Sequence, residues 1–137
     1  MNNTLDLTTF KKAIISLKKA LDAYEVDNHN EFIRDSCIQR FEHCYDFSIK
    51  MIRRHLKNIV DNAGEIDQMS FESVIREAYT KNVIKDSFDI WADYRADRNE
   101  TSHGYDETLA KNIVNNLNDF YTQLTFLIQK LEEAYEA

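Results

Sequence analysis

The sequence predicts an all-α protein, arranged as an antiparallel up-and-down four-helix bundle with a split third arm. The chain has no proline and only two glycines among its 137 residues, and these two residue types supply many of the tight turns that sheet proteins need. Proline breaks helix interiors and glycine weakens them, so their scarcity permits long helices. Apolar residues also recur at spacings of three and four, which is the helical period.

Length and composition indicate one domain that spans residues 1–137. Hydrophobic residues make up 43% of the chain and charged residues 30%, a balance typical of a globular protein with a real core. No long apolar run could span a membrane, and the first residues lack the layout of a signal peptide. We therefore expect a cytoplasmic protein without membrane association.

The charge distribution limits how the protein binds nucleic acid. The net charge of −7 argues against a protein that coats nucleic acid without specificity. Residues 50–57 nevertheless carry four basic side chains and no acidic one. A local basic surface on an acidic body therefore remains open.

Two long helices are expected in the first half of the chain. The first is predicted to be capped by Thr8 or Thr9 and to end near Asp27, and the second to extend to a stop at Gly64. The second helix has one apolar face, formed by Ile33, Cys37, Phe41, Cys44, Ser48, Ile52 and Ile59. Its two cysteines lie about two turns apart on that face, which is too far for a disulfide within the helix, so we interpret them as core residues.

The second half of the chain predicts the split third arm and a final helix. Ser70 is a candidate cap for one short helix, and Asp86 or Ser87 for another that carries Trp91 and Tyr94. At helical spacing, this aromatic pair favours a core or interface position. One continuous helix is expected from about Asp106, with an apolar face of Leu109, Ile113, Leu117, Phe120, Leu124, Leu127 and Leu131.

Residues 98–105, with the sequence Arg-Asn-Glu-Thr-Ser-His-Gly-Tyr, are the best candidates for chemistry. Histidine titrates near neutral pH and can move a proton, whereas arginine keeps its charge and can hold a phosphate with its fork of N–H groups. His103 could thus deprotonate a 2′-hydroxyl while Arg98 stabilises the charge on phosphorus oxygens, with no metal ion or cofactor. The spacing equally fits a helix junction in which Arg98 only pairs with an acid.

Three motifs resemble the nucleotidyltransferase substrate-binding proteins, the HepT-like family of the HEPN superfamily. They are residues 38–42 (Ile-Gln-Arg-Phe-Glu) followed by Lys50, residues 73–78 (Ser-Val-Ile-Arg-Glu-Ala), and residues 98–107, which extend the segment above by Asp-Glu. The family signature is Arg, four residues, His, one residue and Tyr. Arg98, His103 and Tyr105 match its fixed positions.

The resemblance implies a two-fold homodimer whose two signatures meet in a cleft and form a metal-independent endoribonuclease that acts on RNA. Such proteins act as toxins, and an MNT-type nucleotidyltransferase serves as the antitoxin. It transfers AMP onto the signature tyrosine, here Tyr105. Added negative charge and bulk beside His103 would repel an RNA backbone and could occupy Arg98.

Supporting roles are implied for residues near the signature. Asn99 fits a polar position that helps to hold phosphate. An acidic residue on the second helix often accompanies the arginine, and here both Glu42 and Asp46 qualify. Either acid could instead pair with Lys50, which follows at the same helical spacing.

Two other functions fit the same sequence. The protein could be a noncatalytic subunit that binds a substrate or a nucleotide for a partner nucleotidyltransferase, with Arg98 gripping a phosphate. It could also be a structural dimerisation module. The intact signature argues against the last alternative, because a scaffold needs neither Arg98 nor His103.

Overall fold

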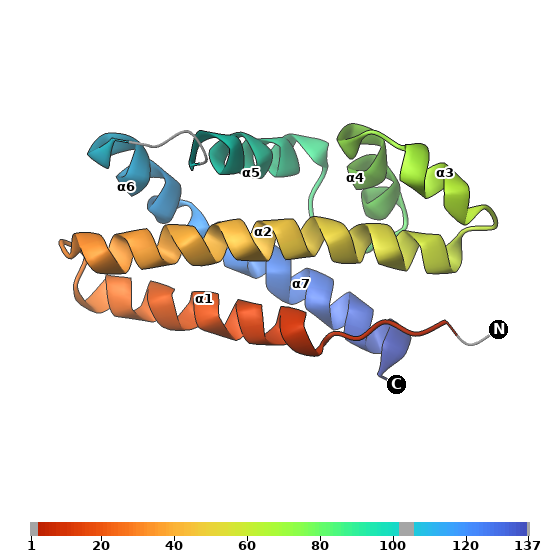
Figure 1. Cartoon of the computed structure of the whole chain (residues 1–137), viewed down its shortest axis with the longest axis horizontal. Coiled ribbons are helices and arrows are strands. Elements are labelled where there is room, and N and C mark those ends of the chain that lie inside the picture. Colours follow the sequence, from red (N-terminus) through yellow and green to blue (C-terminus); the bar gives the residue numbers. More distant parts are fainter. Residues whose placement is uncertain (1–2, 102–105, 137) are drawn as a thin grey trace.

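The structure, a computed structural model, describes residues 3–101 and 106–136, and these residues form helices and no strand (Figure 1). The prediction of an all-α protein is therefore confirmed. The helices are α1 (Thr8–Val26), α2 (Glu31–Ile59), α3 (Ala63–Gln68), α4 (Phe71–Thr80), α5 (Phe88–Thr101), α6 (Glu107–Asn115) and α7 (Leu117–Tyr135). In the part of the chain that is described, no helix is both long and apolar enough to cross a membrane.

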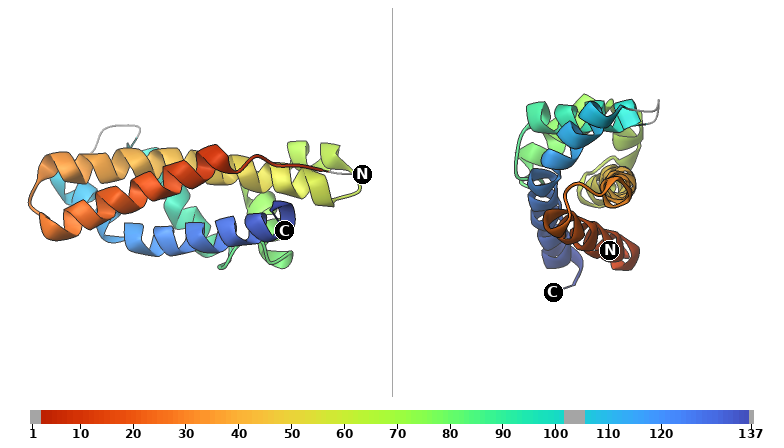
Figure 2. Two further views of the ribbon diagram at one scale, coloured as in Figure 1. Left: turned by 90° about the horizontal axis from the view of Figure 1, so that it is seen from below. Right: turned by 90° about the vertical axis from the view of Figure 1, so that its left-hand side faces the viewer.

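The helices run alternately along one long axis. The helices α1 and α2 form an antiparallel pair, α3 to α5 lead back along α2, and α6 and α7 return toward the end where the chain starts (Figures 1 and 2). The central element is α2, which contacts each of the other six described helices. Its position explains why its apolar face is long.

The buried face of α2 follows the predicted spacing. Cys37, Phe41, Cys44 and Ile52 are fully buried, whereas Ile59 at the end of the helix is exposed. Both cysteines are free thiols. Burial raises the pKa of Cys37 to about 11 and that of Cys44 to about 12. Both side chains are therefore protonated core residues and not nucleophiles.

Four aromatic side chains join α2, α5 and α7 in the centre of the molecule. The Phe120 ring packs edge-on against Phe41 at 5.0 Å and against Tyr94 at 4.9 Å between ring centroids. Trp91 packs against Tyr94 at 5.5 Å and is fully buried. We refer to Phe41, Trp91, Tyr94 and Phe120 as the aromatic cluster. It fixes the face that α5 turns toward α2.

Two predicted helix ends were wrong. The helix α1 begins at Thr8 without a threonine cap. Instead, the Asp6 carboxylate accepts a hydrogen bond of 2.9 Å from the Thr8 backbone N–H. The helix α2 ends at Ile59, and Gly64 lies inside α3, whose cap is the Asn62 side chain. Asparagine is among the strongest N-caps, and here it starts a new helix before the glycine can end the old one. The Ser70 cap of α4 is confirmed, with Oγ accepting the Ser73 N–H.

The last helix is interrupted, contrary to the prediction of one continuous helix. Asn116 has φ −96° and ψ −2° and its backbone N–H donates to the Ile113 carbonyl oxygen at 3.0 Å, a tighter turn than the α-helical one. Asparagine competes with the helix through its own side chain, which favours such a break. The helix α6 therefore takes a different direction from α7 (Figure 1). The cap at Asp106 agrees with the predicted start, since its carboxylate accepts the Leu109 N–H.

His55, on the buried face of α2, is packed in the interior. Its Nδ1 lies 2.7 Å from the hydroxyl of Tyr135, which also accepts a hydrogen bond from Asn58. Because Asn58 donates to the oxygen, the hydroxyl proton is available to a neutral imidazole. Burial lowers the pKa of His55 below its usual 6.5. Folding therefore favours the neutral form of this ring.

Acidification through this range should destabilise the fold. The unfolded chain takes up a proton at His55 at higher pH than the folded chain does, so the free energy of unfolding is greatest above the unfolded pKa of 6.5 and falls as pH decreases below it. Urea denaturation at about pH 7.5 and about pH 5.5 measures the difference. His55→Gln should reduce it, whereas replacement of the exposed His29 by glutamine should not. An equal pH dependence in the parent and in His55→Gln would contradict this account.

Candidate functional site

Arg98 is carried to the surface of α2 by the packing of α5. Trp91, Tyr94 and Arg98 are spaced by three and four residues, so they share one face of the helix. The first two are buried in the aromatic cluster, and Arg98 follows one turn later, where the interface reaches solvent. Opposite it, α2 presents Glu42 and Asp46, which are also one turn apart.

The Arg98 guanidinium binds both acids at once. Its Nε and Nη2 donate to the two oxygens of Asp46 at 3.1 and 3.0 Å, and its Nη1 donates to Glu42 at 2.9 Å. The two predicted candidates for the acidic position thus both contact the arginine. Lys50 forms no ion pair with either of them in the described structure, and its ammonium lies over the Phe47 ring.

These hydrogen bonds orient Arg98 without using all of its N–H groups. A guanidinium has five N–H groups, and three of them donate to the acids, which leaves at most two for a ligand. The Arg98 side chain is 25% exposed, so a ligand can reach it from solvent. The hydrogen bonds with Asp46 raise its pKa further above the usual value. The guanidinium is therefore a fixed cation with a set orientation.

The rest of the signature lies close to Arg98 along the chain. Thr101 is buried and its hydroxyl donates to the Arg98 carbonyl oxygen at 2.8 Å, which closes the end of α5. Asn99 is exposed on α5. His103 and Tyr105, the predicted base and modification site, lie outside the described residues.

Arg34 is a second arginine near this segment that the sequence analysis did not single out. It lies in the first turn of α2 with only 11% of its side chain exposed, and its Nη1 is 3.6 Å from Glu107 at the start of α6. Among the described residues, its buried Nε has no hydrogen-bond partner. The spacing of three between Arg34 and Cys37 places it on the buried face, and this was the available signal.

The basic stretch in the second half of α2 is partly used for folding. Arg53 donates to the backbone carbonyl oxygens of Ile66 and Met69 near the end of α3. Lys57 forms an ion pair with Asp67 of α3. Lys50 lies over an aromatic ring. Of the four basic residues, only Arg54 is exposed and makes no hydrogen bond, ion pair or ring contact in the described structure. Lys50 and Arg54 remain exposed one helical turn apart, so only part of the stretch is used for folding. Outside residues 102–105 and the chain ends, no group of three or more His, Cys, Asp or Glu residues is placed to hold a metal ion.

Comparison with known proteins gives consistent matches over nearly the full length. Residues 5–133 match the family described as "Nucleotidyltransferase substrate binding protein like". A curated protein of Haemophilus influenzae named "Probable ribonuclease HepT" is 30% identical, and the alignment covers 97% of this chain and 96% of that protein. A solved structure from Haemophilus influenzae, described as the fold of a substrate binding domain of a nucleotidyltransferase, superposes with a TM-score of 0.87. It is 29% identical, and the match covers 93% of this chain and 99% of the other.

The Arg98–Glu42 contact should stabilise the fold measurably. In a double-mutant cycle with Arg98→Met and Glu42→Gln, we expect a coupling free energy of about 1 kcal/mol from urea denaturation, since both side chains are largely shielded from water. The pair Arg76–Glu72 is a matched control, because its N–O distance is also 2.9 Å but both side chains are well exposed. Its coupling should be about 0.3–0.5 kcal/mol. Equal coupling in the two pairs would show that Arg98 is not held more firmly than a surface arginine.

Proposed function

The chain belongs to the nucleotidyltransferase substrate binding protein family, and we propose that it is a HepT-like toxin, a metal-independent endoribonuclease. The observation that carries this proposal is the oriented Arg98 guanidinium in the last turn of α5, five residues before His103 in the chain. The likeness to a protein named "Probable ribonuclease HepT" over nearly the full length supports it.

Arg98 and His103 have complementary roles in the proposed reaction. His103 takes the proton of a 2′-hydroxyl, the 2′-oxygen attacks the adjacent phosphorus, and the bond from phosphorus to the 5′-oxygen breaks. The 5′-oxygen leaves with a proton from water, and a 2′,3′-cyclic phosphate remains. Arg98 donates its remaining N–H groups to the phosphorus oxygens, where negative charge increases in the transition state.

Glu42 and Asp46 act as positioning residues for Arg98, and Asn99 contacts the phosphate beside it. A guanidinium on a long side chain loses rotational freedom when it meets a ligand, and two acids that hold it beforehand reduce that cost. Both acids are proposed to share this role, because Asp46 supplies two hydrogen bonds and Glu42 the third. In the proposed two-fold homodimer, two such sites face one cleft.

Regulation is proposed to act on Tyr105. An MNT-type nucleotidyltransferase transfers AMP from ATP, so that the tyrosine oxygen bonds to the α-phosphorus and pyrophosphate leaves. The added phosphate places negative charge two residues from His103. It repels an RNA backbone and competes for the free N–H groups of Arg98.

A second candidate function is a noncatalytic subunit that binds a substrate or a nucleotide for such a partner. The description of the solved relative as a substrate binding domain favours it. In that case Arg98 grips a phosphate of the bound molecule, and no RNA is cleaved.

RNA cleavage by the purified protein in chelator tests the proposed activity. We expect the parent to cleave single-stranded RNA and both Arg98→Ala and His103→Ala to lose at least about 100-fold in rate. Asp46→Asn should lose less, because the arginine stays but is held less firmly. Arg76→Ala is a control in an exposed arginine of α4, which lies over Phe88 at the opposite end of α5 from Arg98. A folded parent that leaves several RNAs intact would favour the binding subunit.

Mass spectrometry after incubation with the partner nucleotidyltransferase and ATP tests the regulation. We expect the mass to increase by whole AMP units on Tyr105 and RNA cleavage to fall in proportion to the modified fraction. Tyr105→Phe should remain unmodified, whereas Tyr79→Phe, which changes an exposed tyrosine of α4, should be modified like the parent. AMP on the Tyr105→Phe protein would disprove the assigned site.

A further inference from the structure

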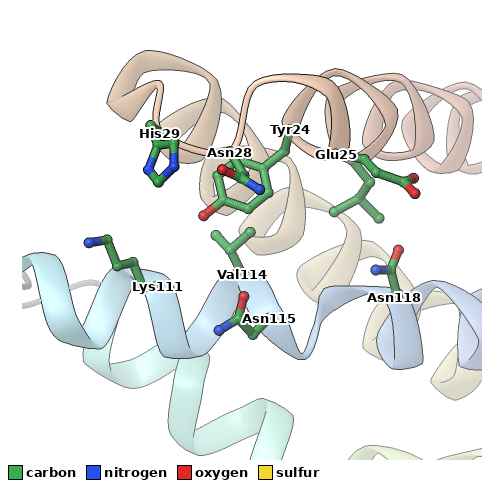
Figure 3. Close-up of a pocket in the computed structure, with 9 residues that line it drawn as sticks. Tyr24, Glu25, Asn28, His29, Lys111, Val114, Asn115 and Asn118 are labelled. Atoms are coloured by element: carbon green, nitrogen blue, oxygen red, sulfur yellow. The ribbon is translucent and has the colours of Figure 1, made fainter.

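A pocket of about 550 Å³ lies between the end of α1 and the junction of α6 with α7 (Figure 3). Its volume is within the range of roughly 300–1,000 Å³ that small-molecule sites occupy. The lining residues are Leu21, Tyr24, Glu25, Asn28, His29, Lys111, Val114, Asn115 and Asn118. None of them belongs to the site around Arg98, so the pocket is a separate feature of the molecule.

The pocket combines an apolar floor with exposed polar side chains. The half-buried Tyr24 and the side chain of Val114 face each other across it (Figure 3). In the described structure, the side chains of Asn28, His29 and Asn115 make no hydrogen bond or ion pair, although all three line the pocket. Lys111 is exposed and pairs with Glu107 at 3.3 Å, which leaves N–H groups for a further acceptor.

We propose that this pocket binds one adenine nucleotide. An aromatic ring beside an opening offers a surface on which a base can stack. Asparagine amides both donate and accept, which matches the N6 and N7 edge of adenine. Lys111 supplies a cation for the phosphate, and the Tyr24 hydroxyl end points toward the side of the pocket where Lys111 and His29 lie (Figure 3).

The position of the pocket suggests two sources for the nucleotide. With a rise of about 1.5 Å per residue, Lys111 and Asn115 lie about 6 and 12 Å along α6 from Glu107, where the helix begins after the signature segment. A free nucleotide can enter from solvent, or the pocket can hold one adenosine of an RNA strand that continues toward Arg98. The shared chemistry is a stacked adenine with a phosphate at Lys111.

Calorimetric titration of the full chain with AMP tests the pocket without any need for RNA cleavage. We expect saturable binding that Tyr24→Leu weakens by about tenfold or more, because the stacking surface is lost. Tyr79→Leu, which changes an exposed tyrosine outside the pocket, should bind AMP like the parent. Lys111→Gln should bind adenosine like the parent but should no longer bind AMP more tightly than adenosine. Lys130→Gln should still bind AMP more tightly than adenosine. Asn115→Leu should reduce the preference for AMP over UMP. Because Asn115 is exposed, this variant tests the pocket even if Tyr24→Leu is unstable.

The two sources are separated by competition. Displacement of bound AMP by a short oligoadenylate RNA would identify an RNA subsite, and AMP binding that such RNA leaves unchanged would identify a free nucleotide as the ligand. The absence of saturable AMP binding, or binding that is unaffected by the Tyr24, Lys111 and Asn115 substitutions, would overturn the proposal. Arg98→Ala should retain AMP binding, so failure of the ribonuclease proposal and failure of this one give different results.

Discussion

The aromatic cluster is the constraint on which the rest of the structure depends. Trp91 and Tyr94 seat α5 against Phe120 of α7, whose ring also packs on Phe41 of α2. Edge-to-face contacts of this kind add about 0.5–1.5 kcal/mol each beyond the buried area. One more helical turn brings Arg98 opposite the acids of α2. A rotation of α5 that exposed Trp91 would also carry the guanidinium away from them. Core packing and the orientation of the candidate site are therefore one property of the molecule.

The charges around Arg98 decide what kind of ligand it can hold. Glu42 and Asp46 together outweigh the single guanidinium, so this group of three carries a formal charge of −1. A polyanion is not drawn to such a site by charge alone, and affinity has to come from directed hydrogen bonds at one phosphate. Arg34, in the first turn of α2, is a further cation near the start of α6, where it lies 3.6 Å from Glu107. The chemistry of the site therefore favours precise placement of one phosphodiester over broad electrostatic attraction.

Prediction from the sequence succeeded where periodicity determines the structure. The apolar faces of α2 and α7 follow from spacings of three and four, because helices must bury such a stripe. It failed at Asn116 and Gly64, where one residue's local preference competes with packing between distant helices. It also left Glu42 and Asp46 undecided, because residues one turn apart on one face look equivalent until the opposing arginine is placed. Arg34 was overlooked because a charged residue on an apolar face resembles an interruption of the pattern.

The break at Asn116 gives α6 a degree of independence. A helix of nine residues is too short to be stable by itself, so α6 depends on its contacts with α2 and α7. Its amide hydrogens should then exchange through a local opening whose free energy is below that of global unfolding. The fold would thus combine a persistent core with one short helix that acts as its own cooperative unit.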